Sequence, residues 1–399
     1  MVQSLDTSAK LQTLTRMTRR RARIFHTLIP SRGTRNRSTG FQARCVSDFR
    51  VGRLSKCRRG RGFGNPRYSR LGSLRYEAQS EISALVMNGT VLLLVLAVLL
   101  SVRCTAAATR GEVPHVVVLG CDGFGSVGIT DTNTPVLHRL MKEGAFTLHA
   151  RGVMPTSSSP NWASMIMGAG PEQHGVTSNE WETNKFEIAP TVHGPAGFFP
   201  TVFGLLRQQK PDSKIACVHD WDGFGRLVEP GVANILENVK GSTNTAKRAI
   251  QVLKQEKPTF LFIHFDDVDH AGHTFGWKSA EYFEAVAEID DLIGQVLSAL
   301  REAGIRDQTV VLVTADHGGV AKSHGGATMQ EIEIPWIIAG PGIRRGHEIQ
   351  KPVNTYDTAA TIALLLKLVP PEAWIARPVT EALESGSPPR TSARPAEAQ

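Results

Sequence analysis

The sequence predicts an α/β fold, with a doubly wound, largely parallel sheet flanked by helices in a single domain. Three apolar runs, at 115–119, 259–265 and 310–313, have the length of buried strands, and each ends in acidic or histidine residues. Segments of helical period separate these runs, which is the alternation typical of parallel sheets. Because groups just beyond the carboxyl ends of parallel strands face one crevice, the polar ends of the three strands are expected to meet.

Further elements complete the pattern. Two more strands are expected at 214–218 and 333–339, and helices are expected at 133–143, within 154–170, and at 203–208, 244–257, 281–303 and 356–367. The alternation extends over 109–385 without an internal repeat and is interpreted as one domain. The tail at 386–399 is rich in Pro, Ser and Ala and is expected to be disordered.

The positive charge of the chain lies in its first part. Residues 1–86 contain 19 Lys and Arg against 4 Asp and Glu, whereas the whole chain carries a net charge of +8. Residues 1–81 are expected to form a disordered, Arg-rich leader, which need not belong to the mature protein. A transit peptide, a nucleic-acid arm, a lipid-binding segment and a translation start at Met87 are alternative interpretations. Since the remainder is acidic, no nucleic-acid partner is expected for the folded domain.

Residues 82–108 are expected to be a signal peptide or a membrane anchor. The 21 residues at 82–102 contain no charge, and about 20 apolar residues suffice to cross a bilayer. Alternatively, the aliphatic run at 91–100 and the small residues up to Ala108 fit a signal peptide that is cleaved there. Both alternatives place the domain in an extracytoplasmic space, either secreted or held by a type II anchor.

Carboxylates and imidazoles follow the three central strands. The set comprises Asp122, Asp266, Asp267, Asp269, His273, Asp316, His317 and His324. Divalent zinc binds these oxygen and nitrogen ligands, and the glycines around them let the backbone approach closely. One Asp-His pair after a strand is more often a helix cap or a turn, but three strands that end alike favour a metal site.

Four hydroxyl side chains, Thr156 to Ser159, precede Pro160 at the expected start of a helix. Such residues usually cap the helix, and Ser159 fits that role. The alternative is a nucleophile held where the free N–H groups and the dipole of the helix attract an anion. A serine hydroxyl is a weak nucleophile that metal coordination can activate. The chemistry of the residues does not choose among the four hydroxyls.

Five segments, in order along the chain, resemble one enzyme family. They are VVVLGCDGFG, MPTSSSPNWASMIMGAGPEQHGV, DDVDHAGHTFG, TADHGG and KSHGG, and they span residues 116–326. Together they resemble the type I phosphodiesterase/nucleotide pyrophosphatase branch of the alkaline phosphatase superfamily. The resemblance implies an alkaline phosphatase-like catalytic domain and a metal-dependent hydrolase that acts on phosphoric ester bonds.

The resemblance also implies a site with two divalent metal ions, zinc in the first place. By position, the ligands of one ion are Asp122, Asp316, His317 and Ser158, and the ligands of the other are Asp269, His273 and His324. Ser158 is then the nucleophile that forms a phosphoseryl intermediate, and Asn161 contacts a phosphoryl oxygen. From the residues alone, Arg226 is a further candidate for binding a phosphate oxygen.

The chain departs from the family at several positions. Ser158 stands where the phosphodiesterases usually have threonine and the phosphomonoesterases have serine. Trp162 occupies a position that is often histidine, and His324 follows Asp316 by only eight residues. The expected substrate is a nucleotide or another small phosphodiester. A phosphomonoesterase or a sulfatase of the same fold, and a non-catalytic ligand-binding ectodomain, are the alternatives. The oligomeric state is not predicted.

Overall fold

The computed structural model of the protein describes residues 113–194 and 197–384. Within them, eight strands form one sheet in the order β4-β3-β5-β1-β6-β7-β2-β8. The strands are β1 (His115–Cys121), β2 (Ala145–Arg151), β3 (Ile215–His219), β4 (Ile235–Asn238), β5 (Phe260–Phe265), β6 (Thr309–Ala315), β7 (Glu333–Ala339) and β8 (His347–Glu348). The helices are α3 (Val127–Thr130), α4 (Pro135–Glu143), α5 (Ser158–Met167), α6 (Pro171–His174), α7 (Val202–Gln209), α8 (Asp222–Gly225), α9 (Ser242–Glu256), α10 (Asp267–Phe275), α11 (Ala280–Glu302), α12 (Met329–Ile332) and α13 (Asp357–Leu365).

The sheet is largely parallel, which confirms the prediction. Strands β4, β3, β5, β1 and β6 run parallel to one another, whereas β7 is antiparallel to both of its neighbours, β6 and β2. In the register, Cys121 at the end of β1 lies between Phe265 of β5 and Ala315 of β6. The next residues along β1 and β6, Asp122 and Asp316, therefore leave the sheet at one level.

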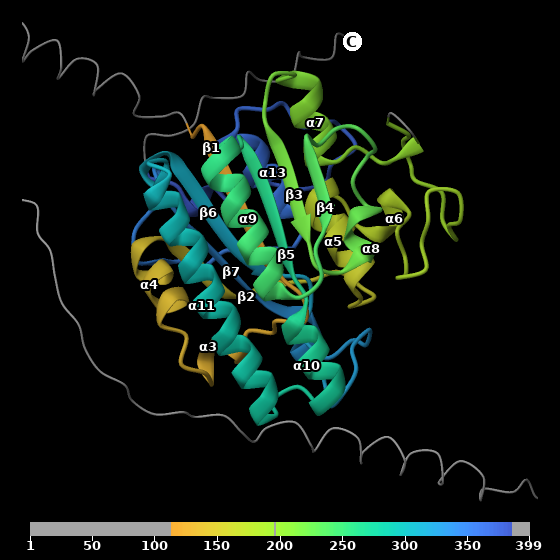
Figure 1. Ribbon diagram of the computed structural model, residues 1–399. Coiled ribbons are helices and arrows are strands. Elements are labelled where there is room, and N and C mark those ends of the chain that lie inside the picture. The colour runs from red at the N-terminus through yellow and green to blue at the C-terminus, as the bar shows by residue number, and fades with distance from the viewer. Residues whose placement is uncertain (1–112, 195–196, 385–399) are drawn as a thin grey trace, which may run out of the picture. The chain divides into compact units, whose positions relative to one another are not determined.

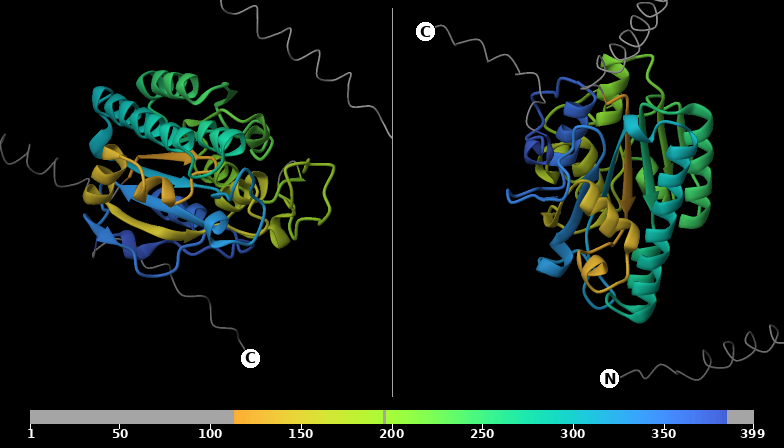
Figure 2. Two further views of the ribbon diagram at one scale, coloured as in Figure 1. Left: turned by 90° about the horizontal axis from the view of Figure 1, so that it is seen from below. Right: turned by 90° about the vertical axis from the view of Figure 1, so that its left-hand side faces the viewer.

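Helices cover both faces of the sheet. Helices α4, α9 and α11 pack on one face, and α5, α7 and α13 pack together on the other, so that the described domain has three layers (Figure 1 and Figure 2). Helix α10 lies beyond the carboxyl end of β5 and packs against α11 (Figure 1). This is the doubly wound arrangement, in which a functional site is expected at the carboxyl ends of the strands.

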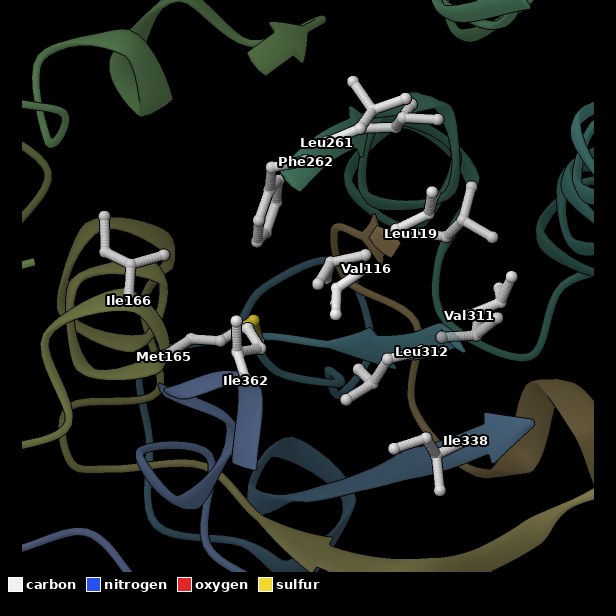
Figure 3. Close-up of a cluster of buried hydrophobic side chains, with 14 of the residues drawn as sticks. Val116, Leu119, Met165, Ile166, Leu261, Phe262, Val311, Leu312, Ile338 and Ile362 are labelled. Atoms are coloured by element: carbon white, nitrogen blue, oxygen red, sulfur yellow. The ribbon is translucent and has the colours of Figure 1, made fainter. Parts of the chain in front are cut away.

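Side chains of the central strands alternate between the two faces (Figure 3). Phe262 and Leu312 lie on the side of Met165 from α5 and Ile362 from α13, whereas Val311 points to the opposite side (Figure 3). These side chains are at most 1% exposed. Burial of one such side chain contributes roughly 1.5–3 kcal/mol. The strands whose ends carry the acids are therefore held in a well-packed frame.

Strands β2, β4 and β8 and helix α10 are not among the predicted elements. Strand β2 (AFTLHAR) mixes buried small residues with exposed polar ones, and β4 and β8 are only four and two residues long, so none has a clear period. Helix α10 (DVDHAGHTF) is mostly polar because one of its faces carries acids and histidines. Its helical period is therefore hidden from a reading of apolar residues.

Several predictions concern residues outside the described part. The leader (1–81), the signal or anchor (82–108) and the tail (386–399) are of this kind. Among the described residues, no helix combines the length and the apolar character needed to span a bilayer. Within the domain, Cys121 and Cys217 are buried free thiols, and burial raises the pKa of both.

Asp290 connects two helices on one face of the sheet. It lies on α11, is 1% exposed, and accepts the backbone N–H groups of Val136 (2.9 Å) and Leu137 (2.8 Å) in the first turn of α4. We expect Asp290→Ala to lower the free energy of unfolding by about 2 kcal/mol, since two buried N–H groups lose their acceptor. Urea unfolding at pH 7 measures this loss.

The control for this substitution is Asp291→Ala, which removes the exposed neighbouring carboxylate. It should change the free energy of unfolding by less than about 0.5 kcal/mol. Equal losses in the two variants would show that the hydrogen bonds to α4 are not what Asp290 contributes.

Candidate metal centre

Two carboxylates and an imidazole meet beyond the ends of β1 and β6. Asp122 directly follows β1, and Asp316 and His317 directly follow β6. Nε2 of His317 lies 3.2 Å from Oδ2 of Asp316 and 3.5 Å from Oδ1 of Asp122, and the three side chains are at most 2% exposed. We call these three residues the first cluster. The parallel register brings them together from positions far apart in the sequence.

The hydrogen bonds of His317 define which ring nitrogen faces the carboxylates. Its Nδ1 lies 2.8 Å from the carbonyl oxygen of Gly318. Since a carbonyl oxygen only accepts, Nδ1 carries the proton and Nε2 presents a lone pair. Burial lowers the pKa of His317 to about 3, so the ring is neutral at pH 7. A neutral imidazole whose lone pair faces two carboxylates is suited to bind a cation.

Three carboxylate oxygens in this region have no hydrogen-bond donor. Within the described residues, Oδ1 of Asp122, Oδ2 of Asp316 and Oδ1 of Asp269 are buried and unpartnered. Burial, and then the negative charge of Asp122, raise the pKa of both Asp316 and Asp269. Buried carboxylates that repel one another are costly unless a positive charge compensates them. The residues therefore fit divalent metal ions.

Asp269, His273 and His324 form the second cluster. Asp269 and His273 lie one turn apart on α10, and His324 lies in the loop after β6. Nε2 of His273 is 3.4 Å from Oδ2 of Asp269, and Nε2 of His324 is 3.8 Å from Oδ1. Nδ1 of His273 faces the carbonyl oxygen of Lys322 (3.0 Å), and Nδ1 of His324 faces that of Thr156 (2.8 Å).

Both histidines of the second cluster therefore carry their proton on Nδ1. Their Nε2 atoms face each other at 3.1 Å, so that two lone pairs meet beside a carboxylate. This arrangement is repulsive unless a cation lies between them. The second cluster is also more open than the first, because the His273 side chain is 44% exposed. Solvent thus reaches the second cluster more easily.

The two clusters adjoin each other. The rings of His317 and His324 stack with their centroids 3.8 Å apart. Asp122, Asp316 and His317 offer ligand atoms that all lie within 4.8 Å of one another, and so do Asp269, His317 and His324. The two groups share His317, and the six predicted carboxylate and imidazole residues therefore lie together at this end of the sheet.

Ser158 is the hydroxyl that faces the first cluster. Its Oγ lies 3.2 Å from Nε2 of His317, and the residue is 5% exposed. The hydroxyl of Thr156 instead donates to the carbonyl oxygen of Gly326 and accepts the N–H of Gly325. Ser158 is also the first residue of the ten-residue helix α5, where its own backbone N–H is unpaired among the described residues and the helix dipole favours an anion.

Known proteins are similar to this chain in sequence and in fold. A family model described as type I phosphodiesterase/nucleotide pyrophosphatase matches residues 116–198 and 206–332, which is more than half of the chain. The chain belongs to this family. The match confirms the resemblance of the five sequence segments.

Curated relatives of this phosphodiesterase-family chain are distant and longer. Human ectonucleotide pyrophosphatase/phosphodiesterase family member 1 is 25% identical over 218 residues, which are 52% of this chain and 24% of the relative. Human bis(5'-adenosyl)-triphosphatase ENPP4 is 25% identical over 214 residues, 51% of this chain and 47% of the relative. The chain thus spans about a quarter to a half of the length of these relatives.

Solved structures share the fold of this family member. Murine ectonucleotide pyrophosphatase/phosphodiesterase 5, an inactive variant in complex with AMP, matches with a TM-score of 0.57 at 16% identity, over 68% of this chain and all of that chain. A 2-O GAG sulfatase matches with a TM-score of 0.53 at 16% identity, over 68% of this chain and 74% of that one. These matches show the alkaline phosphatase-like architecture.

Asn161 has other partners than the expected substrate contact. The residue is fully buried, and its Nδ2 lies 3.0–3.3 Å from the carbonyl oxygens of Val153, Pro155 and Ser157. Its Oδ1 accepts the N–H of Val153 at 2.6 Å. No amide N–H remains to donate to a phosphoryl oxygen, so this expectation is corrected. Asn161 instead holds the loop that leads into α5.

Asn179 is a neighbour of Ser158 that the sequence did not single out. Its Oδ1 accepts the backbone N–H of Ser159 at 2.8 Å, and among the described residues its Nδ2 makes no hydrogen bond. The predicted phosphate-binding residue Arg226 donates to the carbonyl oxygen of Asn179 and lies 5.9 Å from the ring centre of Trp221. Asn179 lies in the irregular segment that follows α6, so no period marks it.

Two ring N–H groups hold Asp122 from the side away from His317. Nε1 of Trp162 lies 3.0 Å, and Nε2 of His264 lies 3.1 Å, from Oδ2 of Asp122. Burial alone would raise the pKa of Asp122, but the hydrogen bond from His264 and the nearby imidazoles hold it below its usual range. Neither ring was predicted to take part in the site. Trp162 departs from the family pattern, and His264 is hidden within an apolar strand.

His174 is structural and makes stability depend on pH. The residue is 2% exposed, its Nδ1 accepts the N–H of Val176 (3.0 Å), and its Nε2 faces the hydroxyl of Ser164 (2.9 Å). Burial lowers the pKa of His174 to about 3, below the roughly 6.5 of an unfolded chain. The unfolded state therefore binds the proton first, and this contribution to stability is lost as pH falls from about 6.5 towards 3.

We expect the His174→Asn variant to lose about 2 kcal/mol less stability than the wild type between pH 7 and pH 5, since its amide oxygen accepts the Val176 N–H but does not titrate. Urea unfolding of both proteins at the two pH values, at one zinc concentration, measures the difference. Identical losses would mean that His174 titrates alike in the folded and unfolded states.

Proposed function

We propose that the chain is an exported, metal-dependent hydrolase of the phosphodiesterase/nucleotide pyrophosphatase type, with Ser158 as its nucleophile. The main support is the position of the Ser158 hydroxyl. Its Oγ lies 3.2 Å from Nε2 of His317, beside buried carboxylate oxygens that lack donors. A hydroxyl in such a place is one that a cation can activate. Family membership supports the same chemistry.

The cofactors in this proposal are two divalent metal ions. Asp122, Asp316, His317 and Ser158 would hold one ion, and Asp269, His273 and His324 would hold the other. The set contains oxygen and nitrogen ligands and no thiolate, which suits zinc. Bound there, the ions would lower the pKa of the Ser158 hydroxyl and offset the charge on the leaving oxygen.

The chain itself supplies the nucleophile and the donors around it. Oγ of Ser158 gives up its proton to the solvent and bonds to phosphorus, while the bond from phosphorus to the leaving oxygen breaks and the leaving oxygen takes up a proton from water. The backbone N–H of Ser158, at the start of α5, and the Nδ2 group of Asn179 have no acceptor among the described residues, and both would donate to the phosphoryl oxygens. A water molecule then cleaves the phosphoseryl bond and returns a proton to Ser158.

The proposed substrate is a nucleotide or another small phosphodiester. One relative is named a bis(5'-adenosyl)-triphosphatase, and one structural neighbour was solved with AMP. Arg226 stands near Asn179 and is proposed to contact a non-reacting part of the substrate. A sulfatase is less well supported. Sulfatases resemble a Cys/Ser-x-Pro-x-Arg pattern at the nucleophile, which would place arginine at position 162, whereas this chain has Trp162, whose indole is turned to Asp122.

For the whole chain, we propose a catalytic domain at 109–385 that residues 82–108 export or anchor outside the cytoplasm. Residues 1–81 and 386–399 are proposed to be disordered flanks. N-terminal sequencing of the mature protein tests the processing: a start at Thr109 supports a cleaved signal, and a start within 1–86 supports a retained segment. If the leader is retained and residues 82–102 span the membrane, the Arg-rich leader would lie inside the cell.

The activity is tested with the full chain supplied with zinc. We expect bis-p-nitrophenyl phosphate to be hydrolysed with a higher kcat/KM than p-nitrophenyl phosphate, and p-nitrophenyl sulfate to be left intact. Preference for the monoester would indicate a phosphomonoesterase. A protein that binds two equivalents of zinc but hydrolyses none of these esters would instead be a ligand-binding ectodomain.

A further inference from the structure

Asp122 belongs to the first cluster, and its two oxygens have different surroundings. Oδ2 lies within hydrogen-bonding distance of Trp162 Nε1 (3.0 Å) and His264 Nε2 (3.1 Å), whereas Oδ1 is buried without a donor. We propose that Trp162 and His264 are positioning residues that fix the rotation of Asp122, so that only Oδ1 is presented to a metal ion. This inference rests on the proposed function.

The direction of both hydrogen bonds follows from the chemistry of the rings. An indole N–H can only donate, so Trp162 donates to Oδ2. Nδ1 of His264 is buried and has no partner among the described residues, and Nε2 faces an ionised acceptor, so the proton of His264 lies on Nε2. Two donors converge on one oxygen of Asp122. The carboxylate cannot rotate without breaking both bonds.

Helix α5 carries both the nucleophile and one of the two donors to Asp122. Trp162 follows Ser158 by four residues in α5, and residues four apart lie on one face of a helix. The same helix face therefore presents the Ser158 hydroxyl to His317 and the Trp162 indole to Asp122. One helix thus carries both the nucleophile and a donor that holds Asp122.

The indole itself is held by close packing. Trp162 is fully buried, and its ring meets His264 and Phe262 edge to face, with centroids 4.9 Å and 5.9 Å apart. A Cβ atom at Gly120 would lie 2.7 Å from two atoms of the indole ring. Strand β1 therefore needs glycine at this position to admit the tryptophan. The packing explains why the larger ring is found at a position that is often histidine in the family.

The consequence concerns metal affinity more than the fold. Outer partners that orient a metal ligand typically contribute about 10–100-fold in affinity. Without the indole N–H, one bond to Oδ2 is lost and the carboxylate gains freedom to turn. The first cluster should then bind its ion more weakly, while the second cluster, which Trp162 does not touch, should be unaffected.

The test compares two buried tryptophans in the full chain. Trp162→Phe keeps an aromatic ring but removes the N–H that faces Asp122. The matched control is Trp336→Phe, because Trp336 is also fully buried and its Nε1 donates to the hydroxyl of Thr358, within the core. Zinc affinity is measured by competition with a chromogenic chelator, and the fold of the zinc-free proteins is checked by circular dichroism.

We expect Trp162→Phe to weaken one of the two zinc equivalents about 10–100-fold and to leave the other unchanged. Trp336→Phe should leave both affinities unchanged. His264→Phe, the second variant, removes the other donor and should weaken the same zinc equivalent; it decides the matter if Trp162→Phe does not fold.

Two outcomes overturn the inference. Zinc affinities equal to those of the wild type in the folded variants would show that the rings only pack. Failure of both variants to fold would show that the core, and not the metal, needs these rings. Absence of zinc binding by the wild-type chain is a different result, because it contradicts the proposed function itself. Since zinc affinity is the readout, the outcome does not depend on finding the substrate.

Discussion

Ser158→Ala should lower the turnover of a diester substrate by at least about 10³-fold, since removal of a covalent nucleophile leaves only the remaining catalysis of the site. Both zinc equivalents should stay bound, because alanine leaves the carboxylate and imidazole ligands in place. Two measurements check this: the steady-state rate with bis-p-nitrophenyl phosphate, and the metal content of the purified variant. Lost turnover with retained metal is expected for a nucleophile, whereas loss of metal would indicate that Ser158 is essential for metal binding.

The neighbouring hydroxyl provides the control. Ser157 lies one residue before α5, is only partly buried, and its side chain makes no capping bond to the helix. Ser157→Ala should therefore keep turnover within a factor of a few of the wild type. If Ser157→Ala lost activity and Ser158→Ala kept it, the nucleophile would be Ser157 and not Ser158.

The carboxylates proposed as metal ligands are predictable from the sequence because of where parallel strands end. Asp122 and Asp316 directly follow apolar runs, and a parallel register places such residues at one level. The type of fold follows from the same runs. Residues at strand ends can thus be located from the end of each apolar run in the sequence.

The groups that hold the ligands are not predictable in this way. His264 lies inside a strand, Asn179 lies in an irregular stretch, and Trp162 is an apolar residue in an apolar helix. Each acts through a single hydrogen bond across the fold, which leaves no period in the sequence. Asn161 shows the opposite error, since a polar residue next to the nucleophile serves the backbone and not the substrate.

Asp316→Asn is expected to empty the first metal position. Oδ1 of Asp316 accepts the N–H groups of Gly123 (3.1 Å) and His317 (2.9 Å), which an amide oxygen can also accept. Oδ2, however, lies 3.2 Å from Nε2 of His317. An amide nitrogen in its place would donate to that lone pair, so the substitution removes a charge and also occupies the imidazole. Zinc affinity should fall by more than about 100-fold, beyond the usual effect of an outer partner.

The zinc-free variant should respond in the opposite way. Burial and the charge of Asp122 disfavour the ionised form of Asp316, as its raised pKa shows, so a neutral amide relieves repulsion in the absence of metal. Thermal unfolding with excess chelator should therefore give Asp316→Asn a higher Tm than the wild type, and zinc should raise the Tm of the wild type much more.

The control for a buried carboxylate is Asp357→Asn. Asp357 is 6% exposed, and its oxygens accept the N–H groups of Asn354 and Arg377 at the start of α13, away from both clusters. It should lower the Tm with and without zinc by similar amounts, since an amide nitrogen cannot accept one of these bonds. The opposite result would be that, in excess chelator, Asp316→Asn has a lower Tm than the wild type and that zinc raises the Tm of both proteins equally. In that case Asp316 is not a metal ligand. A carboxylate that binds a cation should give opposite shifts on substitution by asparagine: a higher Tm of the zinc-free protein and a lower zinc affinity.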